Sequence, residues 1–138
     1  MGRIFCVMGK SASGKDSIFK ELMHDKSLKL KNIVPYTTRP IRDGEQDGKD
    51  YIFCTEADVQ RLESENKIIE LREYNTVYGI WKYFTVDDGQ IDLDKNSYIL
   101  IGTLETYVKI CMYFGNEKVI PIYIEVEDGE RLMRAISR

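Results

Sequence analysis

The sequence contains few of the residues that build disulfide-rich, collagenous or low-complexity proteins. It has 138 residues with only three cysteines, three prolines, one histidine and one tryptophan. The cysteines, at positions 6, 54 and 111, match no metal-binding or redox spacing. We interpret them as thiols in a reducing compartment and assign them no chemistry.

Long hydrophobic runs are also missing. The longest, residues 119–124, is far shorter than the ~20 residues that a membrane-spanning helix needs, and no signal-peptide segment follows the first methionine. A composition of 43% hydrophobic and 31% charged residues is typical of one soluble domain with a core. We expect a cytoplasmic protein that binds no membrane and is a monomer or homodimer.

Charge is distributed unevenly along the chain. Residues 1–42 hold nine Lys or Arg against three acids, whereas the remainder holds eleven against twenty. The basic segment predicts an anion-binding region, although solvated surface lysines account for part of the excess. The acidic balance of the whole chain argues against a nucleic-acid partner.

Hydrophobic periodicity predicts alternating strands and helices, and hence an α/β fold. Strands are expected at residues 4–8, 32–34, 51–54, 68–74, 77–86, 98–101 and 122–126, with Pro121 opening the last. Helices are expected over residues 15–28 and over residues 55–65, the second capped by Thr55 and Asp58. A third helix is expected to pack on a sheet through an apolar stripe of Leu104, Tyr107, Val108, Cys111 and Met112.

The order of these elements predicts the organisation of the chain. Strand–helix–strand units at both ends indicate a parallel sheet with helices on both faces, interrupted by a small antiparallel lobe. We expect a single domain with its core at residues 1–34 and 95–127, the lobe at 35–94 and a further segment at 128–138. Residues 35–50, rich in turn residues and charge, are expected to form a loop.

The segment between the first strand and the first helix has the pattern GxxxxGK. Its glycines let successive N–H groups point at an anion, the helix adds the positive end of its dipole, and the Lys15 ammonium reaches the outer phosphates. This motif in this context predicts a nucleoside triphosphate site, formed by Gly9, Lys10, Ser11, Ala12, Ser13, Gly14, Lys15, Asp16 and Ser17.

One position of this loop departs from the usual motif. Asp16 follows Lys15 where a serine or threonine hydroxyl for Mg²⁺ is usual, and Ser17 lies about 100° further round the helix. A carboxylate can bind Mg²⁺ directly or through water. Asp16 or Ser17 is therefore the candidate metal ligand.

Four segments in the order FCVMGKSASGKDS, YTTRPIRDGEQDGKDY, IIE and VYG resemble guanylate kinases over nearly the whole chain. The second segment is the most specific, because a TTRxxR…G…DY block after a phosphate loop is peculiar to that family. The resemblance implies a transferase of purine nucleotide metabolism that uses ATP with Mg²⁺. It also implies that the antiparallel lobe binds GMP.

A monophosphate site in this lobe follows from the same block. Arg39 and Arg42 each offer a fork of donors that suits phosphate oxygens. The resemblance implies that they hold the GMP phosphate together with the hydroxyls of Tyr51 and of Tyr78, which precedes Gly79. The kinase interpretation requires that this site be open to a ligand and not filled by carboxylates of the chain itself.

Glu70 ends an apolar stretch, and its carboxylate suits the adjacent N1–H and 2-amino donors of guanine, which adenine lacks. The resemblance implies that Glu70 reads the base. The usual base-site serines are replaced by Pro35 and Ile80, and the usual acidic pair is missing at Ile101 and Thr103. Three residues could supply the missing contacts: Thr37, Thr103 and Glu105.

Three arginines near the end of the sequence, Arg131, Arg134 and Arg138, fall on one face of a predicted helix. Arg134 and Arg138 match the RxxxR spacing of the family's lid, so the resemblance makes them, with Lys15, the catalytic residues that offset charge on the transferring phosphoryl group. Because the rest of the lid and the closing elements do not follow, we expect the native protein to continue beyond Arg138.

The primary hypothesis is transfer of the γ-phosphoryl group of ATP to GMP, giving ADP and GDP. No general base is required, because the attacking phosphate oxygen is already ionised. Two alternatives remain open: a kinase for a different nucleoside or deoxynucleoside monophosphate, and a non-catalytic guanylate-kinase-like binding module.

Overall fold

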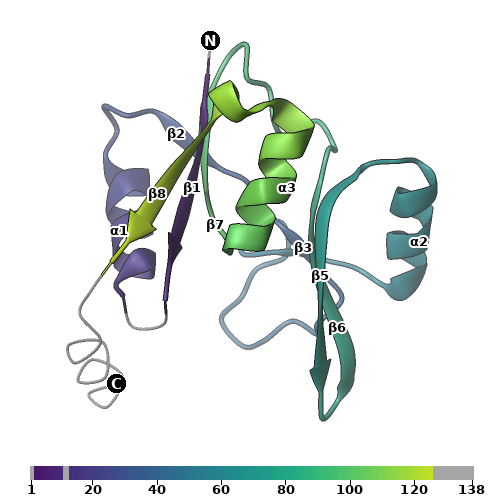
Figure 1. Cartoon of the computed structure of the whole chain (residues 1–138). Helices are drawn as coiled ribbons and strands as arrows, with labels where there is room; N and C mark the ends of the chain where they lie inside the picture. The colour runs from purple at the N-terminus through teal and green to yellow at the C-terminus, as the bar shows by residue number, and fades with distance from the viewer. Residues whose placement is uncertain (1, 11–12, 126–138) are drawn as a thin grey trace. The chain divides into compact units, whose positions relative to one another are not determined.

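The computed structural model describes residues 2–10 and 13–125, and Figure 1 shows the order of their helices and strands. These residues form two compact units. The first unit contains the described residues before position 33 and after position 91, and the second unit is Ile33–Ile91. None of the helices in the described part is long and apolar enough to cross a membrane.

A four-stranded parallel sheet forms the centre of the first unit. Its order is β2-β7-β1-β8, from strands Leu30–Asn32, Ser97–Ile101, Ile4–Gly9 and Val119–Ile124. β1 pairs in parallel with both β7 and β8, and its residues Ile4, Cys6 and Val7 are fully buried. An unbroken apolar strand is what a parallel sheet covered on both faces requires.

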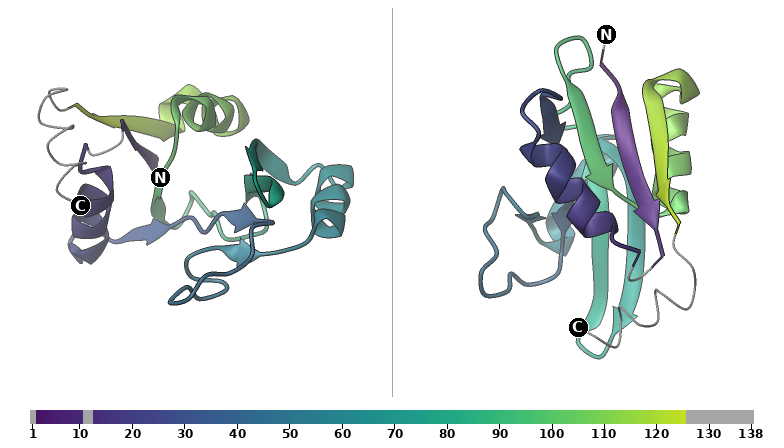
Figure 2. Two further views of the ribbon diagram at one scale, coloured as in Figure 1. Left: turned by 90° about the horizontal axis from the view of Figure 1, so that it is seen from below. Right: turned by 90° about the vertical axis from the view of Figure 1, so that its left-hand side faces the viewer.

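Helices cover both faces of this sheet, as expected. α1 (Lys15–His24) and α3 (Leu104–Phe114) lie on opposite sides in both views of Figure 2. α1 ends earlier than the expected residue 28 because the Asp25 carboxylate accepts hydrogen bonds from both the N–H and the hydroxyl of Ser27. Such a local turn competes with continuation of the helix.

The face by which α3 packs differs from the expected stripe. Thr106, Ile110 and Cys111 are its buried residues, whereas Met112 is 75% exposed and the expected stripe members Leu104 and Val108 are also exposed. Cys111 is common to the expected and the observed face. The Thr106 side also lies close to the chain directly before the helix, since a Cβ added at Gly102 would lie 3.0 Å from the Thr106 methyl group.

Two strands of the first unit are shifted from their expected positions. β2 is Leu30–Asn32 and not residues 32–34, because the N–H and C=O of Val34 bond to the Gln90 side chain instead of a strand. β8 begins at Val119, after the short 3₁₀ helix η1 (Asn116–Lys118), so Pro121 lies inside it. A proline is tolerated there because β8 is an edge strand of the described sheet.

The second unit contains a four-stranded sheet of order β4-β3-β6-β5. The long antiparallel hairpin of β5 (Ile68–Thr76) and β6 (Gly79–Val86) confirms the expected antiparallel lobe. β6 begins at Gly79 and not at residue 77, since Val77 and Tyr78 form the turn of the hairpin. β4 is Ile52–Phe53, and the segment expected to be only a loop contains β3 (Tyr36–Thr37).

One face of the hairpin packs on α2 (Glu56–Ser64). The predicted capping box is present: the Thr55 side chain accepts from the Asp58 N–H, and Asp58 accepts from the Thr55 N–H. The core of this unit joins residues of α2 and β6, namely Val59, Leu62, Phe84 and Val86. The opposite face of the hairpin carries polar and aromatic side chains.

The observed face of α3 makes a stability prediction that separates it from the expected stripe. Ile110→Ala removes a buried side chain and should lower the free energy of unfolding by about 2–5 kcal/mol. Met112→Ala changes an exposed side chain and should alter it by less than about 0.5 kcal/mol. Urea unfolding of both variants measures this, and a larger loss for Met112→Ala would contradict the described packing.

Candidate functional site

The phosphate loop lies in the first unit, between the end of β1 and the start of α1. The Ser13 N–H donates to the Lys10 C=O at 3.1 Å, and the Ile18 N–H donates to the Gly14 C=O at 3.1 Å. Gly14 caps α1 with φ 91°, a left-handed conformation that favours glycine. The helix therefore begins at Lys15 with its first N–H groups directed toward the loop.

Gly9 is required by close packing. A Cβ at this position would lie 2.5 Å from the Ser13 hydroxyl and 3.0 Å from the Ile124 carbonyl oxygen. Ser13 itself is buried, so the loop cannot move outward without disturbing the strand beside it. Two of the predicted loop residues, Ser11 and Ala12, lie outside the described residues.

The first unit offers few candidate metal ligands. Asp16 and Ser17 are both exposed at the start of α1. Within residues 2–10 and 13–125, no group of three His, Cys, Asp or Glu side chains gathers closely enough to hold a metal. This donor set fits Mg²⁺, which protein sites usually bind through one or two carboxylates together with substrate phosphates.

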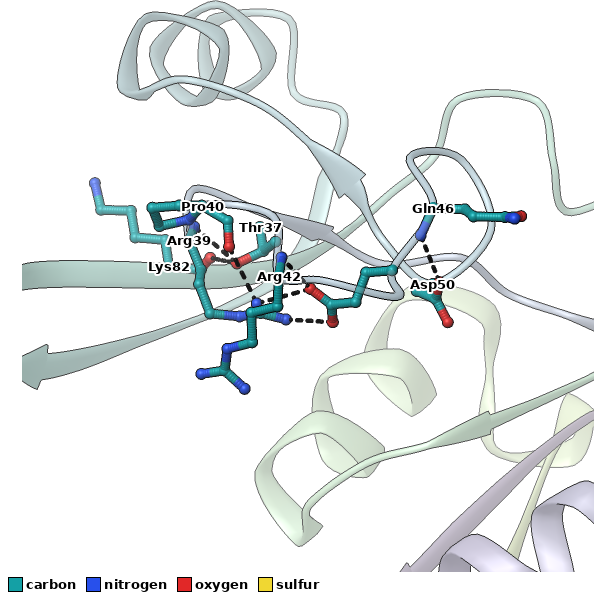
Figure 3. Close-up of polar contacts among 8 residues, drawn as sticks. Thr37, Arg39, Pro40, Arg42, Gln46, Asp50 and Lys82 are labelled. Carbon is teal, nitrogen blue, oxygen red and sulfur yellow. Dashed lines mark hydrogen bonds and ion pairs between the residues drawn. The ribbon is translucent and has the colours of Figure 1, made fainter.

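Arg39 lies at the centre of a second candidate site, in the second unit. Its side chain is 3% exposed, and two of its nitrogens donate to the two carboxylate oxygens of Glu45, both at 2.9 Å. The backbone N–H of Arg39 donates to the Thr37 hydroxyl, which in turn donates to the backbone carbonyl of Lys82 (Figure 3). Arg39 therefore ties its loop to β6 through Thr37.

The two arginines of the TTRxxR block differ in their surroundings. The backbone N–H of Arg42 donates to the Glu45 carboxylate at 2.8 Å. The guanidinium of Arg42 extends away from the contacts drawn in Figure 3. It lies 6.0 Å from the Trp81 ring, on which Tyr78 stacks with a centroid distance of 6.0 Å. The sequence predicted that both guanidinium groups are open to a ligand. The guanidinium of Arg39 is instead occupied by Glu45. Arg42 and the 82%-exposed Tyr78 both contact Trp81.

Aromatic rings surround Arg39. Its guanidinium carbon lies 5.2 Å from the Tyr51 ring centroid and 5.8 Å from that of Phe53. Tyr51 in turn contacts Tyr83 edge-on at 5.8 Å. The predicted phosphate residues Arg39 and Tyr51 are thus brought together on the face of the hairpin opposite α2.

Glu70 is buried on β5, with 4% of its surface exposed. It accepts a hydrogen bond from the Thr85 hydroxyl at 2.9 Å, and Arg72 donates from Nε at 3.2 Å and from a terminal nitrogen at 3.4 Å. Burial alone would lower the pKa of Arg72, but the charge and hydrogen bonds of Glu70 outweigh it and raise that pKa. Arg72 therefore stays positively charged.

Sequence reasoning missed several residues of this site: Glu45, Arg72, Trp81, Tyr83 and Thr85. A usable signal was present, because Glu70 and Arg72 are two apart on a predicted strand and so share a face. The register shows their cross-strand partners, Thr85 opposite Glu70 and Tyr83 opposite Arg72. The predicted lid arginines Arg134 and Arg138, with Arg131, lie outside the described residues.

Comparisons with known proteins agree on one family. A family model described as guanylate kinase matches residues 1–86. A guanylate kinase of Thermotoga maritima is 34% identical over 153 aligned positions, which cover 94% of this chain and 72% of the relative. A guanylate kinase of Mycoplasma mobile is 43% identical over 82 residues, which cover 59% of this chain and 41% of the relative.

Structural comparison gives the same result. The crystal structure of guanylate kinase from Anaplasma phagocytophilum has a TM-score of 0.70 and 27% identity, over 99% of this chain and 67% of that chain. The aligned region of this chain thus spans less than half the length of the Mycoplasma mobile relative and about two thirds of the Anaplasma phagocytophilum chain.

The Arg39–Glu45 pair makes stability depend on pH. Hydrogen bonds from Arg39 and Arg42 lower the pKa of Glu45 from its usual 4.5 to about 2. The folded protein therefore binds this proton less readily than the unfolded chain, so the contribution of the pair is complete above about pH 4.5 and is lost as pH falls toward about 2.

Glu45→Gln should therefore lose less stability than the wild type between pH 5 and pH 2.5 in urea unfolding. Glu63→Gln, which changes an exposed acid on α2 of the same unit, is the matched control and should follow the wild type. Parallel pH profiles for the wild type and Glu45→Gln would show that the pair does not stabilise the fold.

Proposed function

The chain belongs to the guanylate kinase family, and from this premise we propose that it transfers the γ-phosphoryl group of ATP to GMP, giving ADP and GDP. The observation that supports this best is the buried carboxylate of Glu70 on the same hairpin face as the aromatic and arginine cluster. The Glu70 carboxylate, an acceptor for a base edge, and arginine cations for a phosphate then lie along the β5–β6 pair. Tyr74 lies opposite Trp81, the ring beside Arg42, and so marks the phosphate end of the hairpin. Glu70 and Tyr74 are separated by about 14 Å along β5 at ~3.4 Å per residue, which is on the order of the length of a nucleoside monophosphate.

In this proposal the two arginines have different roles. The Arg42 guanidinium, with the hydroxyls of Tyr51 and Tyr78, meets the GMP phosphate. Arg39, whose fork Glu45 occupies, holds the loop that carries Arg42, because the same carboxylate binds the Arg42 N–H. The chain's own carboxylate therefore fills the Arg39 half of the predicted phosphate site, so the condition that the site be free of such carboxylates fails at Arg39 and the proposal depends on Arg42.

The phosphate loop takes ATP in the same proposal. Its backbone N–H groups and the start of α1 hold the phosphates, and Lys15 offsets charge on the transferring group. Asp16 or Ser17 would hold the Mg²⁺ that accompanies ATP, and the bound metal would neutralise part of the phosphate charge. Arg134 and Arg138 would close over the reacting group from the segment 128–138, and we place the protein in the cytoplasm as a monomer or homodimer.

The direct test is a coupled assay of the full chain with ATP and Mg²⁺ across GMP, dGMP, AMP, dTMP and UMP. We expect turnover with GMP and dGMP, and at least about 100-fold lower kcat/KM with AMP, because the Glu70 carboxylate has no donor to meet on that base. Equal rates with AMP would remove the role of Glu70. Binding of GMP without any transfer would instead identify a binding module.

The division of labour between the arginines predicts a selective loss. Arg42→Lys should weaken GMP binding about 10-fold, since an ammonium cannot reproduce a bidentate fork, and should leave ATP binding within about 2-fold. Calorimetric titration with each nucleotide measures both affinities. Arg61→Lys, on the exposed side of α2, is the matched control. Equal losses for ATP and GMP would place Arg42 outside the GMP site.

A further inference from the structure

We propose that Arg72 is a specificity-determining residue that donates a hydrogen bond to the 6-oxo oxygen of the purine whose N1–H meets Glu70. The inference rests on the proposed function, because it concerns the base end of the same GMP site. It assigns recognition of the base to two adjacent side chains of one strand, one an acceptor and the other a donor.

The strand places the two groups side by side. Glu70 and Arg72 are two residues apart on β5, so both project from the face of the hairpin opposite α2. Their cross-strand partners Thr85 and Tyr83 lie on the same face of β6. The Arg72 guanidinium lies 6.0 Å from the Tyr83 ring centroid, which limits how far it can turn away from Glu70.

The hydrogen-bond inventory leaves Arg72 with donors for a ligand. A guanidinium has five N–H groups. Arg72 directs two of its three nitrogens at Glu70 and also hydrogen-bonds the Tyr74 side chain, and these three contacts do not use all five groups. The contacts with Glu70, at 3.2 and 3.4 Å, are longer than the ~2.7–2.9 Å of a tight charge-assisted bond, so Arg72 is paired with Glu70 without being locked to it. The Thr85 hydroxyl donates to Glu70 and so is already used.

The chemistry of purine edges fits this pair. Guanine presents an acceptor, O6, directly beside a donor, N1–H, so a guanidinium and a carboxylate lying side by side match both. Adenine presents the reverse order, an amino donor toward the cation and a bare nitrogen toward the carboxylate, and both contacts are unfavourable. The class of base that this pair recognises is therefore the 6-oxopurines, which includes guanine and hypoxanthine.

A comparison of nucleotides that differ only at position 6 tests the proposal. 6-Thio-GMP keeps the N1–H and 2-amino donors but replaces O6 by sulfur, a weak acceptor. The wild-type protein should bind GMP about 10-fold or more tightly than 6-thio-GMP, and in Arg72→Met this ratio should fall to within about 2-fold. The ratio of GMP to IMP affinity should not change in Arg72→Met, because both nucleotides carry O6. Calorimetric titration gives each Kd.

Controls separate this role from a purely structural one. Arg61→Met removes an exposed arginine of the same unit and should keep both wild-type ratios. If Arg72→Met does not fold, Arg72→Lys decides the question, because an ammonium that pairs with Glu70 lacks the fork that spans to O6, and its GMP to 6-thio-GMP ratio should also fall. A wild-type ratio in a folded Arg72 variant overturns the proposal, whereas no GMP binding by the wild-type protein overturns the proposed function itself.

Discussion

The pairing of β5 with β6 is the constraint on which the second unit depends. Its register sends alternate residues to opposite faces, so Phe84 meets α2 while Thr85 meets Glu70. A shift of the β5–β6 register by one residue would expose the core side chains and bury the polar side chains of the opposite face against α2. The burial of the apolar face therefore also fixes the position of the polar face. The packing on α2 and the arrangement of the candidate site in this unit are therefore set by the same hydrogen-bond ladder.

Charge in this unit is held in pairs within the fold. The buried guanidinium of Arg39 meets Glu45, and the buried carboxylate of Glu70 meets Arg72. An unpaired buried charge would be costly, so each pairing holds its two side chains in place before any ligand arrives. The predicted phosphate loop of the first unit would work differently, because it would offer backbone N–H groups and a helix terminus, which need no counter-charge.

Strong local signals predicted much of the fold. β1, the capping box of α2, the parallel sheet and the antiparallel hairpin all follow from apolar runs and cap residues that act over a few positions. The α3 stripe was only partly right: Cys111 is buried as expected, whereas Leu104, Val108 and Met112 are exposed and Thr106 and Ile110 are buried in their place. β2 and the start of β8 were misplaced and β3 was missed, because strand ends and strands of two or three residues are decided by the strands beside them.

The sequence by itself determined the family, the GxxxxGK motif and the residue types of the proposed GMP site, because these depend on order and spacing along the chain. Only the tertiary structure decided that Glu45 occupies the fork of Arg39, that Arg42 extends toward Trp81, and that Arg72 and Thr85 contact Glu70. These contacts join side chains from different turns and strands. Whether two charges meet depends on the path of the backbone between them, and packing sets that path.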